Sequence, residues 1–155
     1  MHKTVEEAEE FVQKLLTHPT SSTTRVGLAV PFTSLHPVAQ AAKGTFLKVG
    51  AQNMNAAEEG AFTGEIAATM LEEAGASFVL LGHSERRRFF GENSSVVNRK
   101  VKKALQTKLT PIVCIGEPAL TENKEPAETF LRTQIQETLA DVPAEDFARL
   151  CIAYE

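Results

Sequence analysis

Two periodicities of hydrophobic residues alternate along this chain in a regular order. In some segments apolar residues recur every three or four positions, the pattern of an amphipathic helix; in others they form short continuous runs, typical of strands buried on both faces. The helical pattern predicts helices over residues 4–16, 36–43, 63–74, 94–107 and 126–139, with a further short helix that follows His83 and runs through Phe90. The continuous runs predict strands over residues 25–31, 46–52, 78–81, 111–115 and 150–154.

The order of these elements predicts a parallel sheet. Helix and strand alternate from the first helix to the last strand, and each repeat is close to the roughly 30 residues of a strand–helix–strand unit. Near-continuous apolar strands joined by crossover helices belong to α/β folds, in which the sheet is either doubly wound or closed as a barrel. The alternation therefore predicts the α/β class and leaves these two topologies open.

Glycine motifs favour one of the two topologies. A doubly wound nucleotide-binding sheet normally carries Gly-x-Gly-x-x-Gly or Gly-x-x-x-x-Gly-Lys after a strand, and the sequence contains neither. The barrel is therefore favoured. In both folds ligands bind beyond the carboxyl ends of the strands. The positions to inspect are then Phe32, Asn53, His83, Glu117 and Glu155.

Composition and charge narrow the class of protein. The 155 residues are 43% hydrophobic and 23% charged, with a net charge of −4, as in a globular domain. Lys and Arg are scattered, which argues against a nucleic-acid or anionic-membrane surface and favours a small metabolite as partner. No apolar run approaches the roughly 20 residues of a membrane span, so we expect a cytoplasmic protein. Cys114 and Cys151 lie in strand-like runs without ligand spacing, so we expect two buried cysteines and no metal site.

His83 is the strongest candidate for chemistry among the four histidines. It directly follows the predicted strand 78–81 and precedes a short helix. Backbone N–H groups at a helix start favour a nitrogen that accepts a hydrogen bond and disfavour imidazolium, so we expect a neutral ring. Such a ring can donate a hydrogen bond to a substrate carbonyl; the alternative is a structural histidine. The other three histidines have the settings of surface or capping residues.

Glu155 is the corresponding candidate among the carboxylates. It ends the last predicted strand, Cys-Ile-Ala-Tyr-Glu. A carboxylate is costly to desolvate at the end of an apolar strand, and this setting suits a general base. The alternative is a charged residue that marks the exit of the strand into solvent.

Five motifs resemble the triosephosphate isomerase family. They are Gly50-Ala51-Gln52-Asn53, Gly60-Ala61-Phe62-Thr63-Gly64-Glu65, Gly82-His83-Ser84-Glu85-Arg86-Arg87, Cys114-Ile115-Gly116-Glu117 and Ala153-Tyr154-Glu155. They occur in the family's order and spacing, and the resemblance runs from Met1 to the last residue. It implies an α/β fold of the incomplete TIM (β/α)8-barrel type, a single partial domain over residues 1–155. About five of the eight strands would be present, without the first strand and everything after the sixth.

The resemblance also implies an activity. The family interconverts dihydroxyacetone phosphate and glyceraldehyde 3-phosphate through an enediolate, in glycolysis and gluconeogenesis, with no cofactor and no metal. His83 matches the histidine that polarises the substrate carbonyl, and Glu155 matches the carboxylate that moves the proton. Glu85 matches a glutamate beside the family's catalytic lysine. We therefore expect His83 and Glu155, at the mouths of separate strands, to face one sugar-phosphate pocket.

A homodimer is a further implication of the resemblance. Arg86 and Glu65 match a pair that joins neighbouring subunits, and Thr63 matches a residue inserted beside the partner's active site. The same loop contains Met54 and Phe62, apolar residues that would be poorly placed on the exposed tip of a monomer. We predict that Phe62, Thr63, Glu65 and Arg86 form the interface; the alternative is a loop folded back on its own barrel.

Several parts of the family pattern do not occur in the 155 residues. The asparagine and lysine of the first strand, the lid loop and the Gly-rich phosphate-binding turns are missing, so no substrate-binding residue is assigned and this polypeptide alone should have negligible activity. The segment between Glu117 and Pro126 departs from the pattern, and no role is carried over there. Two hypotheses follow: an isomerase represented by a partial sequence, or a non-catalytic derivative that acts as an interaction module on a full-length subunit. The motifs disfavour a third, another phosphate-handling barrel.

Overall fold

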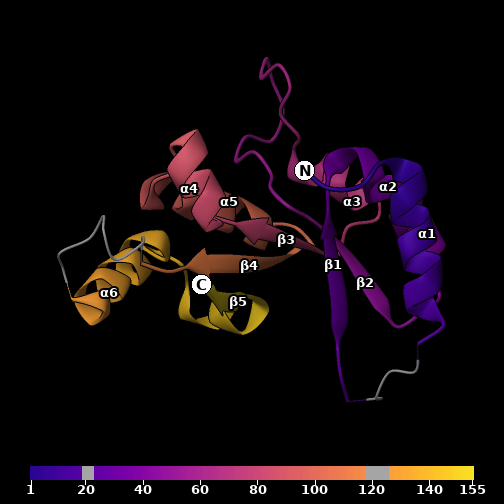
Figure 1. The fold of residues 1–155 in the computed structure, drawn as a ribbon. Helices are drawn as coiled ribbons and strands as arrows, with labels where there is room; N and C mark the ends of the chain where they lie inside the picture. Colours follow the sequence, from indigo (N-terminus) through magenta and orange to yellow (C-terminus); the bar gives the residue numbers. More distant parts are fainter. Residues whose placement is uncertain (19–22, 118–125) are drawn as a thin grey trace.

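The computed structural model describes residues 1–18, 23–117 and 126–155, so the segment between Glu117 and Pro126 lies outside the described residues. Strands and helices alternate along the chain as expected (Figure 1). The strands are β1 (Val26–Val30), β2 (Leu47–Ala51), β3 (Phe78–Leu81), β4 (Thr110–Ile115) and β5 (Cys151–Tyr154). The helices are α1 (Val5–Leu16), α2 (Phe32–Ala41), α3 (Ala68–Glu73), α4 (Ser84–Phe90), α5 (Ser94–Leu105), α6 (Ala127–Thr138) and the 3-10 helix η1 (Ala144–Arg149).

The five strands form one parallel sheet in chain order, β1-β2-β3-β4-β5. The register runs from Val26↔Leu47 in the first pair to Ile115↔Tyr154 in the last. A doubly wound sheet reverses its strand order at a switch point, whereas the wall of a barrel adds each strand beside the one before it. The observed order is that of a barrel wall. It confirms the prediction of an α/β fold that corresponds to part of a TIM barrel.

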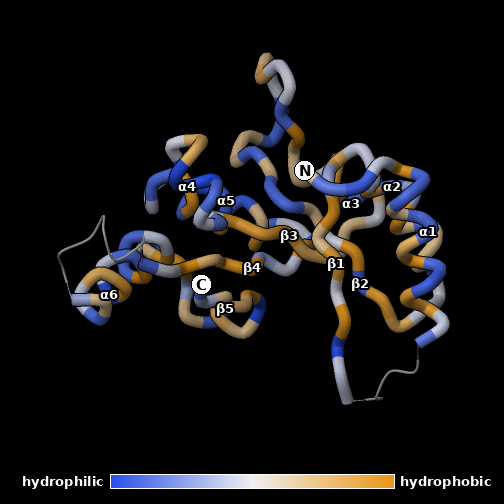
Figure 2. The backbone as a smooth tube through the Cα atoms, viewed as in Figure 1, coloured by the Kyte–Doolittle hydropathy of each residue, from blue (hydrophilic) through white to orange (hydrophobic). Residues whose placement is uncertain are grey.

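The helices pack on the sheet and enclose the core. α2 packs on β2, α5 packs on β3 and β4, and α1 packs on α2 (Figure 1). Hydrophobic residues follow the strands, while hydrophilic residues lie on the outer turns of the helices (Figure 2). Val97 and Val101 of α5 are fully buried, as are Val79, Leu81 and Val113 of the strands beneath them. Burying one such side chain contributes about 1.5–3 kcal/mol.

Two helices begin four or five residues from their predicted starts. α2 begins at Phe32, four residues early, so that Pro37 lies inside the helix; proline is common in the first turn of a helix, which favoured the later start. α3 begins at Ala68, five residues late, because Gly64 has a φ of +88° and Ala67 is extended. Residues 63–67 therefore belong to the loop between β2 and α3. The 3-10 helix η1 was not predicted, since so short an element leaves no periodicity.

β5 is the exception to the predicted burial of the strands. Ile152 is 45% exposed and Tyr154 is 64% exposed. Within the described residues β5 pairs only with β4, so it is an edge strand. The prediction that Cys151 is buried is therefore wrong: Cys151 is exposed. Cys114 is buried as expected, and burial raises the pKa of its thiol to about 11.

Candidate active site

A glycine places His83 at the mouth of β3. Gly82 follows the strand with a φ of +73°, a left-handed conformation that turns the chain directly into α4. A Cβ atom at this position would lie 2.9 Å from both Cγ atoms of Val97 and 3.0 Å from Nη2 of Arg87. The site therefore requires glycine for its backbone conformation and for its space. As a result, His83 stands at the carboxyl end of a strand and caps the next helix.

The hydrogen bonds of His83 favour one neutral tautomer. Its Nδ1 accepts from the backbone N–H of Glu85 at 3.4 Å, which is the acceptor contact expected at a helix start. Nδ1 then carries no proton, and the proton of a neutral ring lies on Nε2. Nε2 is 2.7 Å from Oε1 of Glu155. The ring can therefore present an N–H donor on the side that faces the carboxylate.

Glu155 reaches His83 across the intervening strand. The backbone N–H of Glu155 donates to the carbonyl of Ile115 at 2.8 Å and continues the β4–β5 ladder. Its Oε1 meets His83, and its Oε2 accepts from the backbone N–H of Ser84 at 2.9 Å. The side chains of His83 and Glu155 are about one-third exposed, at 33% and 31%. An imidazole and a carboxylate from non-adjacent strands thus meet at one edge of the sheet.

Glu85, the third expected catalytic residue, lies beside this pair. It occupies the first turn of α4, and its Oε2 is 3.7 Å from Nδ1 of His83. Its side chain is 74% exposed. The distance exceeds that of a hydrogen bond, so Glu85 lies near the imidazole without bonding to it. The catalytic role of Glu85 stays a prediction.

A cavity of about 540 Å³ borders the pair on the side of Glu155. Its lining includes Glu155, Glu85 and Ser84, together with Arg87, Phe130 and Gln134, but not His83. Glu155 therefore borders the cavity and also contacts His83. That both groups face one shared substrate pocket stays a prediction.

The other strand-end positions serve different contacts. Asn53 is buried, and its Oδ1 accepts from Nζ of Lys100 at 2.7 Å. Glu117 accepts from the hydroxyl of Tyr154 at 2.9 Å, and this hydrogen bond to a carboxylate raises the pKa of the Tyr154 hydroxyl. Phe32 is partly exposed at the start of α2. Of the five inspected positions, His83 and Glu155 contact each other directly, and Glu117 lines the same cavity as Glu155.

Sequence reasoning missed two groups near the pair, Ser84 and Arg87. Ser84 contributes a backbone N–H rather than its side chain, and its place at a helix start was the available signal. Arg87 lies in the last turn of α4 and reaches back to the carbonyl of Gly82 at 2.8 Å. No pattern in the sequence indicates such a reversal, because it depends on how α4 lies against the strand ends.

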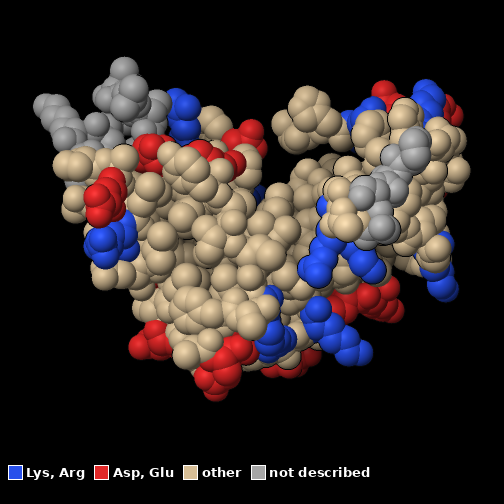
Figure 3. All heavy atoms as spheres, turned by 90° about the horizontal axis from the view of Figure 1, so that it is seen from below, with Lys and Arg blue, Asp and Glu red and all other residues tan. Residues whose placement is uncertain are grey.

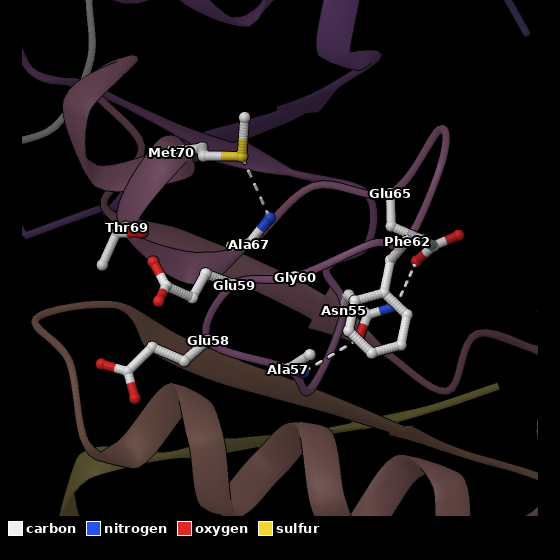
Figure 4. A pocket seen from close by; sticks show the side chains of 10 residues that line it. All are labelled: Asn55, Ala57, Glu58, Glu59, Gly60, Phe62, Glu65, Ala67, Thr69 and Met70. Carbon is white, nitrogen blue, oxygen red and sulfur yellow. Dashed lines mark hydrogen bonds between the residues drawn. The ribbon is translucent and has the colours of Figure 1, made fainter.

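Three of the expected interface residues, Phe62, Thr63 and Glu65, lie on the loop between β2 and α3, which projects from the fold (Figure 1). Phe62 is 51% exposed, and Thr63 is also exposed. Oε2 of Glu65 accepts from the Asn55 amide at 2.7 Å, and this contact lies beside Phe62 in a pocket of about 400 Å³ (Figure 4). Met54 is fully buried in the core, so its predicted place at an interface is wrong.

Arg86, the remaining expected interface residue, has a partner within the chain. Its Nε donates to Oε1 of Glu92 at 2.7 Å, and Glu92 is buried. Its guanidinium also lies 4.6 Å from the centre of the Phe90 ring, within reach of a cation–π interaction. Arg86 and Glu65 thus have separate partners here. Their pairing across a subunit interface stays a prediction.

The described residues show charges of both signs on the face drawn in Figure 3 and no cluster of metal ligands. Lys, Arg, Asp and Glu side chains are interspersed on the face drawn in Figure 3, and neither sign covers it. Among residues 1–18, 23–117 and 126–155, no group of three or more His, Cys, Asp or Glu side chains is arranged to hold a metal ion. In the same part of the chain, no helix has the length and apolar character needed to cross a bilayer.

Comparisons with known proteins all point to one family. The family model described as triosephosphate isomerase matches residues 1–155. A triosephosphate isomerase of Protochlamydia amoebophila is 54% identical over 155 residues, which are all of this chain and 59% of that protein. Those of Acetivibrio thermocellus and Alkaliphilus oremlandii are each 44% identical, and the chain covers 62% of each. The chain thus spans about three-fifths of the length of these curated relatives. Since the family model covers the whole chain, the chain belongs to the triosephosphate isomerase family.

Proposed function

We propose that these residues form the catalytic half of a triosephosphate isomerase, which interconverts dihydroxyacetone phosphate and glyceraldehyde 3-phosphate. The observation that carries the proposal is the 2.7 Å contact between Nε2 of His83 and Oε1 of Glu155. It joins a hydrogen-bond donor and a proton acceptor, the two groups needed to move a proton next to a carbonyl. Membership of the triosephosphate isomerase family supports the proposed identity of the substrate.

The reaction needs proton transfer between two carbons and between their two oxygens, and no cofactor. Glu155 removes a proton from the substrate carbon next to the carbonyl, and the electron pair moves onto the carbonyl oxygen to give an enediolate. The N–H on Nε2 of His83 donates to that oxygen as its negative charge develops. Nε2 of His83 passes its proton to that oxygen and takes up the proton of the hydroxyl on the other carbon, which becomes the new carbonyl. The protonated Glu155 returns its proton to the former carbonyl carbon. The product is the isomer, and both side chains regain their starting protonation.

For Glu155 to act as a base, the bound substrate must replace one of its present hydrogen bonds. Oε1 accepts from His83 and Oε2 accepts from the N–H of Ser84, so both oxygens have donors. The hydrogen bond from Nε2 of His83 occupies Oε1, the oxygen that would accept the proton of the substrate. A substrate carbonyl that takes over the donor of His83 would free Oε1 for the proton. Substrate binding and activation of the base are thereby linked.

A hybrid enzyme tests the proposal. Residues 1–155 replace the matching segment of the Protochlamydia amoebophila relative, and isomerisation is followed in a coupled assay. We expect turnover, with deuterium from heavy water entering the product at the carbon that receives the proton. His83→Gln should lower kcat by about 10²–10³-fold and Glu155→Gln by about 10²–10⁴-fold. The matched control is His36→Gln, which changes an exposed histidine of α2. A correctly folded hybrid without activity would refute the proposal and favour a non-catalytic interaction module.

We also propose that the complete enzyme is a cytoplasmic homodimer. Phe62 supports the dimer, because an aromatic side chain that is half exposed on a projecting loop is suited to insertion into a partner. Phe62→Asp should shift the hybrid from dimer to monomer in sedimentation experiments. Phe11→Asp, which changes an exposed phenylalanine of α1, is the control. An unchanged dimer in the Phe62 variant would contradict this interface.

A further inference from the structure

Arg87 bridges the carboxyl ends of the two strands behind the candidate pair. Its Nε donates to the carbonyl of Gly82 at 2.8 Å, just after β3. Its Nη2 lies 3.4 Å from the carbonyl of Cys114 in β4, and its Nη1 lies 3.4 Å from Oγ of Ser94 at the start of α5. One planar guanidinium thus connects four elements: the end of β3, its own helix α4, the start of α5 and β4.

The two carbonyl groups that Arg87 contacts belong to residues adjacent to the backbone that positions His83 and Glu155. Gly82 immediately precedes His83, so the position of the Gly82 carbonyl sets where the imidazole leaves β3. Cys114 immediately precedes Ile115, whose carbonyl accepts the backbone N–H of Glu155 at 2.8 Å. The distance between the two catalytic groups therefore depends on the spacing between two strand ends that Arg87 holds.

The partners of Arg87 indicate that its side chain fixes the positions of backbone groups rather than pairing with an opposite charge. Burial lowers the pKa of the Arg87 guanidinium, so the charge is held at some cost. The hydrogen bonds described for Arg87 go to neutral oxygens, whereas Arg86 and Arg149 each have a carboxylate partner. A guanidinium fork can join two fixed acceptors, which a lysine ammonium on its flexible stem does less well.

We propose that Arg87 is a positioning residue that holds His83 and Glu155 at their working separation; this inference rests on the proposed function. Arg87 itself makes no contact with the reacting atoms. It acts through the backbone of Gly82 and Cys114. Because it also lines the cavity of about 540 Å³, a small cation can enter the space left when its side chain is removed.

Kinetics of Arg87→Ala in the hybrid enzyme test the inference. A small displacement of the pair should lower kcat by about 10- to 100-fold and leave KM nearly unchanged, because binding contacts are kept. Guanidinium chloride, far below denaturing concentrations, should restore part of kcat, whereas sodium chloride at equal ionic strength should not. Arg87→Lys should remain impaired. Arg132→Ala, at an exposed arginine of α6 paired with Glu128, is the control and should keep full activity.

The possible outcomes separate this inference from the proposed function. An inactive unsubstituted hybrid overturns both. If the hybrid is active and Arg87→Ala has the same kcat as Arg132→Ala, the positioning role alone is overturned. A rise in the KM of Arg87→Ala with kcat unchanged overturns it as well. Full activity in Arg87→Lys would also overturn it, since charge without the fork would then suffice. Circular dichroism and the urea midpoint of each variant show whether lost activity reflects unfolding, and guanidinium rescue occurs only in a folded protein.

Discussion

Replacing Lys100 with methionine removes one partner from a buried network of charges. Lys100 lies on α5 with 8% of its side chain exposed, and its Nζ donates to Oε1 of Glu92 at 2.6 Å and to Asn53 at 2.7 Å. Glu92 has 5% of its side chain exposed and also accepts from Arg86 at 2.7 Å. Methionine keeps most of the aliphatic stem, so the substitution tests the charge more than the packing.

The expected loss of stability is large. Removing one member of a buried ion pair costs about 3–5 kcal/mol, because the other charge stays buried. Arg86 remains beside Glu92, so the lower end of about 3 kcal/mol applies. The Oε2 atom of Glu92 is buried and has no hydrogen-bond partner within the described residues, so it offers no compensation.

Urea unfolding of the hybrid enzyme measures this loss. The subunit concentration is held fixed, because association contributes to the stability of a dimer. Lys102→Met is the matched control: it lies on the same helix, and its 3.3 Å ion pair with Asp141 is at the surface, where such pairs contribute about 1 kcal/mol or less. If Lys100→Met costs no more than Lys102→Met, the network does not stabilise the fold as argued.

Three further predictions concern a glycine, acid stability and the isolated polypeptide. Gly82→Ala should lower the free energy of unfolding by about 1–3 kcal/mol through backbone strain and should also lower kcat. Gly44→Ala, with a φ of +77° but no atom within 4 Å of its Cβ position, should show the strain without the loss of kcat. Equal kcat in the two variants would contradict a clash of the added Cβ atom at Gly82. Burial acts to raise the pKa of Glu92, but hydrogen bonds from Lys100 and Arg86 outweigh it and hold that pKa below its usual range. The stability that Glu92 provides is therefore complete above the pKa of an unfolded glutamate and lost as pH falls through the native value, so urea midpoints of Glu92→Gln should decline less than those of the parent over that acid range. The 155 residues expressed alone should aggregate, because β1 and β5 are the two edge strands of the sheet within the described residues, and should lack isomerase activity without the family's lid and phosphate-binding turns; a sharp thermal transition by circular dichroism at dilute concentration would argue against aggregation.

The fold was largely predictable because its strands are bounded by clear signals. The bounds of β3 match the predicted run Phe78–Leu81, since four apolar side chains are followed by Gly82, whose φ of +73° turns the chain out of the strand. The start of α3 was not predictable, because residues 63–67 have a helical pattern in sequence but are held in the projecting loop. There the backbone N–H of Asn55 donates to the carbonyl of Ile66 at 2.8 Å. A tertiary contact overrides local propensity here.

The candidate site was predictable in its side chains and not in its backbone. His83 and Glu155 meet because the carboxyl ends of parallel strands share one edge, which follows from the alternation alone. The N–H of Ser84 has no sequence signature, because every residue except proline carries that donor. Met54 and Phe62 are similar apolar residues of one loop, yet only Phe62 is exposed, and only the folded path of the loop distinguishes them.

A kinetic double-mutant cycle tests the central claim, that His83 and Glu155 act as one catalytic unit. The kcat/KM values of the hybrid enzyme, of His83→Gln, of Glu155→Gln and of the double variant are measured under the same conditions. Groups that act on the same transition state are strongly non-additive, so the double variant should be about as slow as the slower single variant. If the two losses multiply instead, the two side chains act independently, and the assignment of one shared site is contradicted.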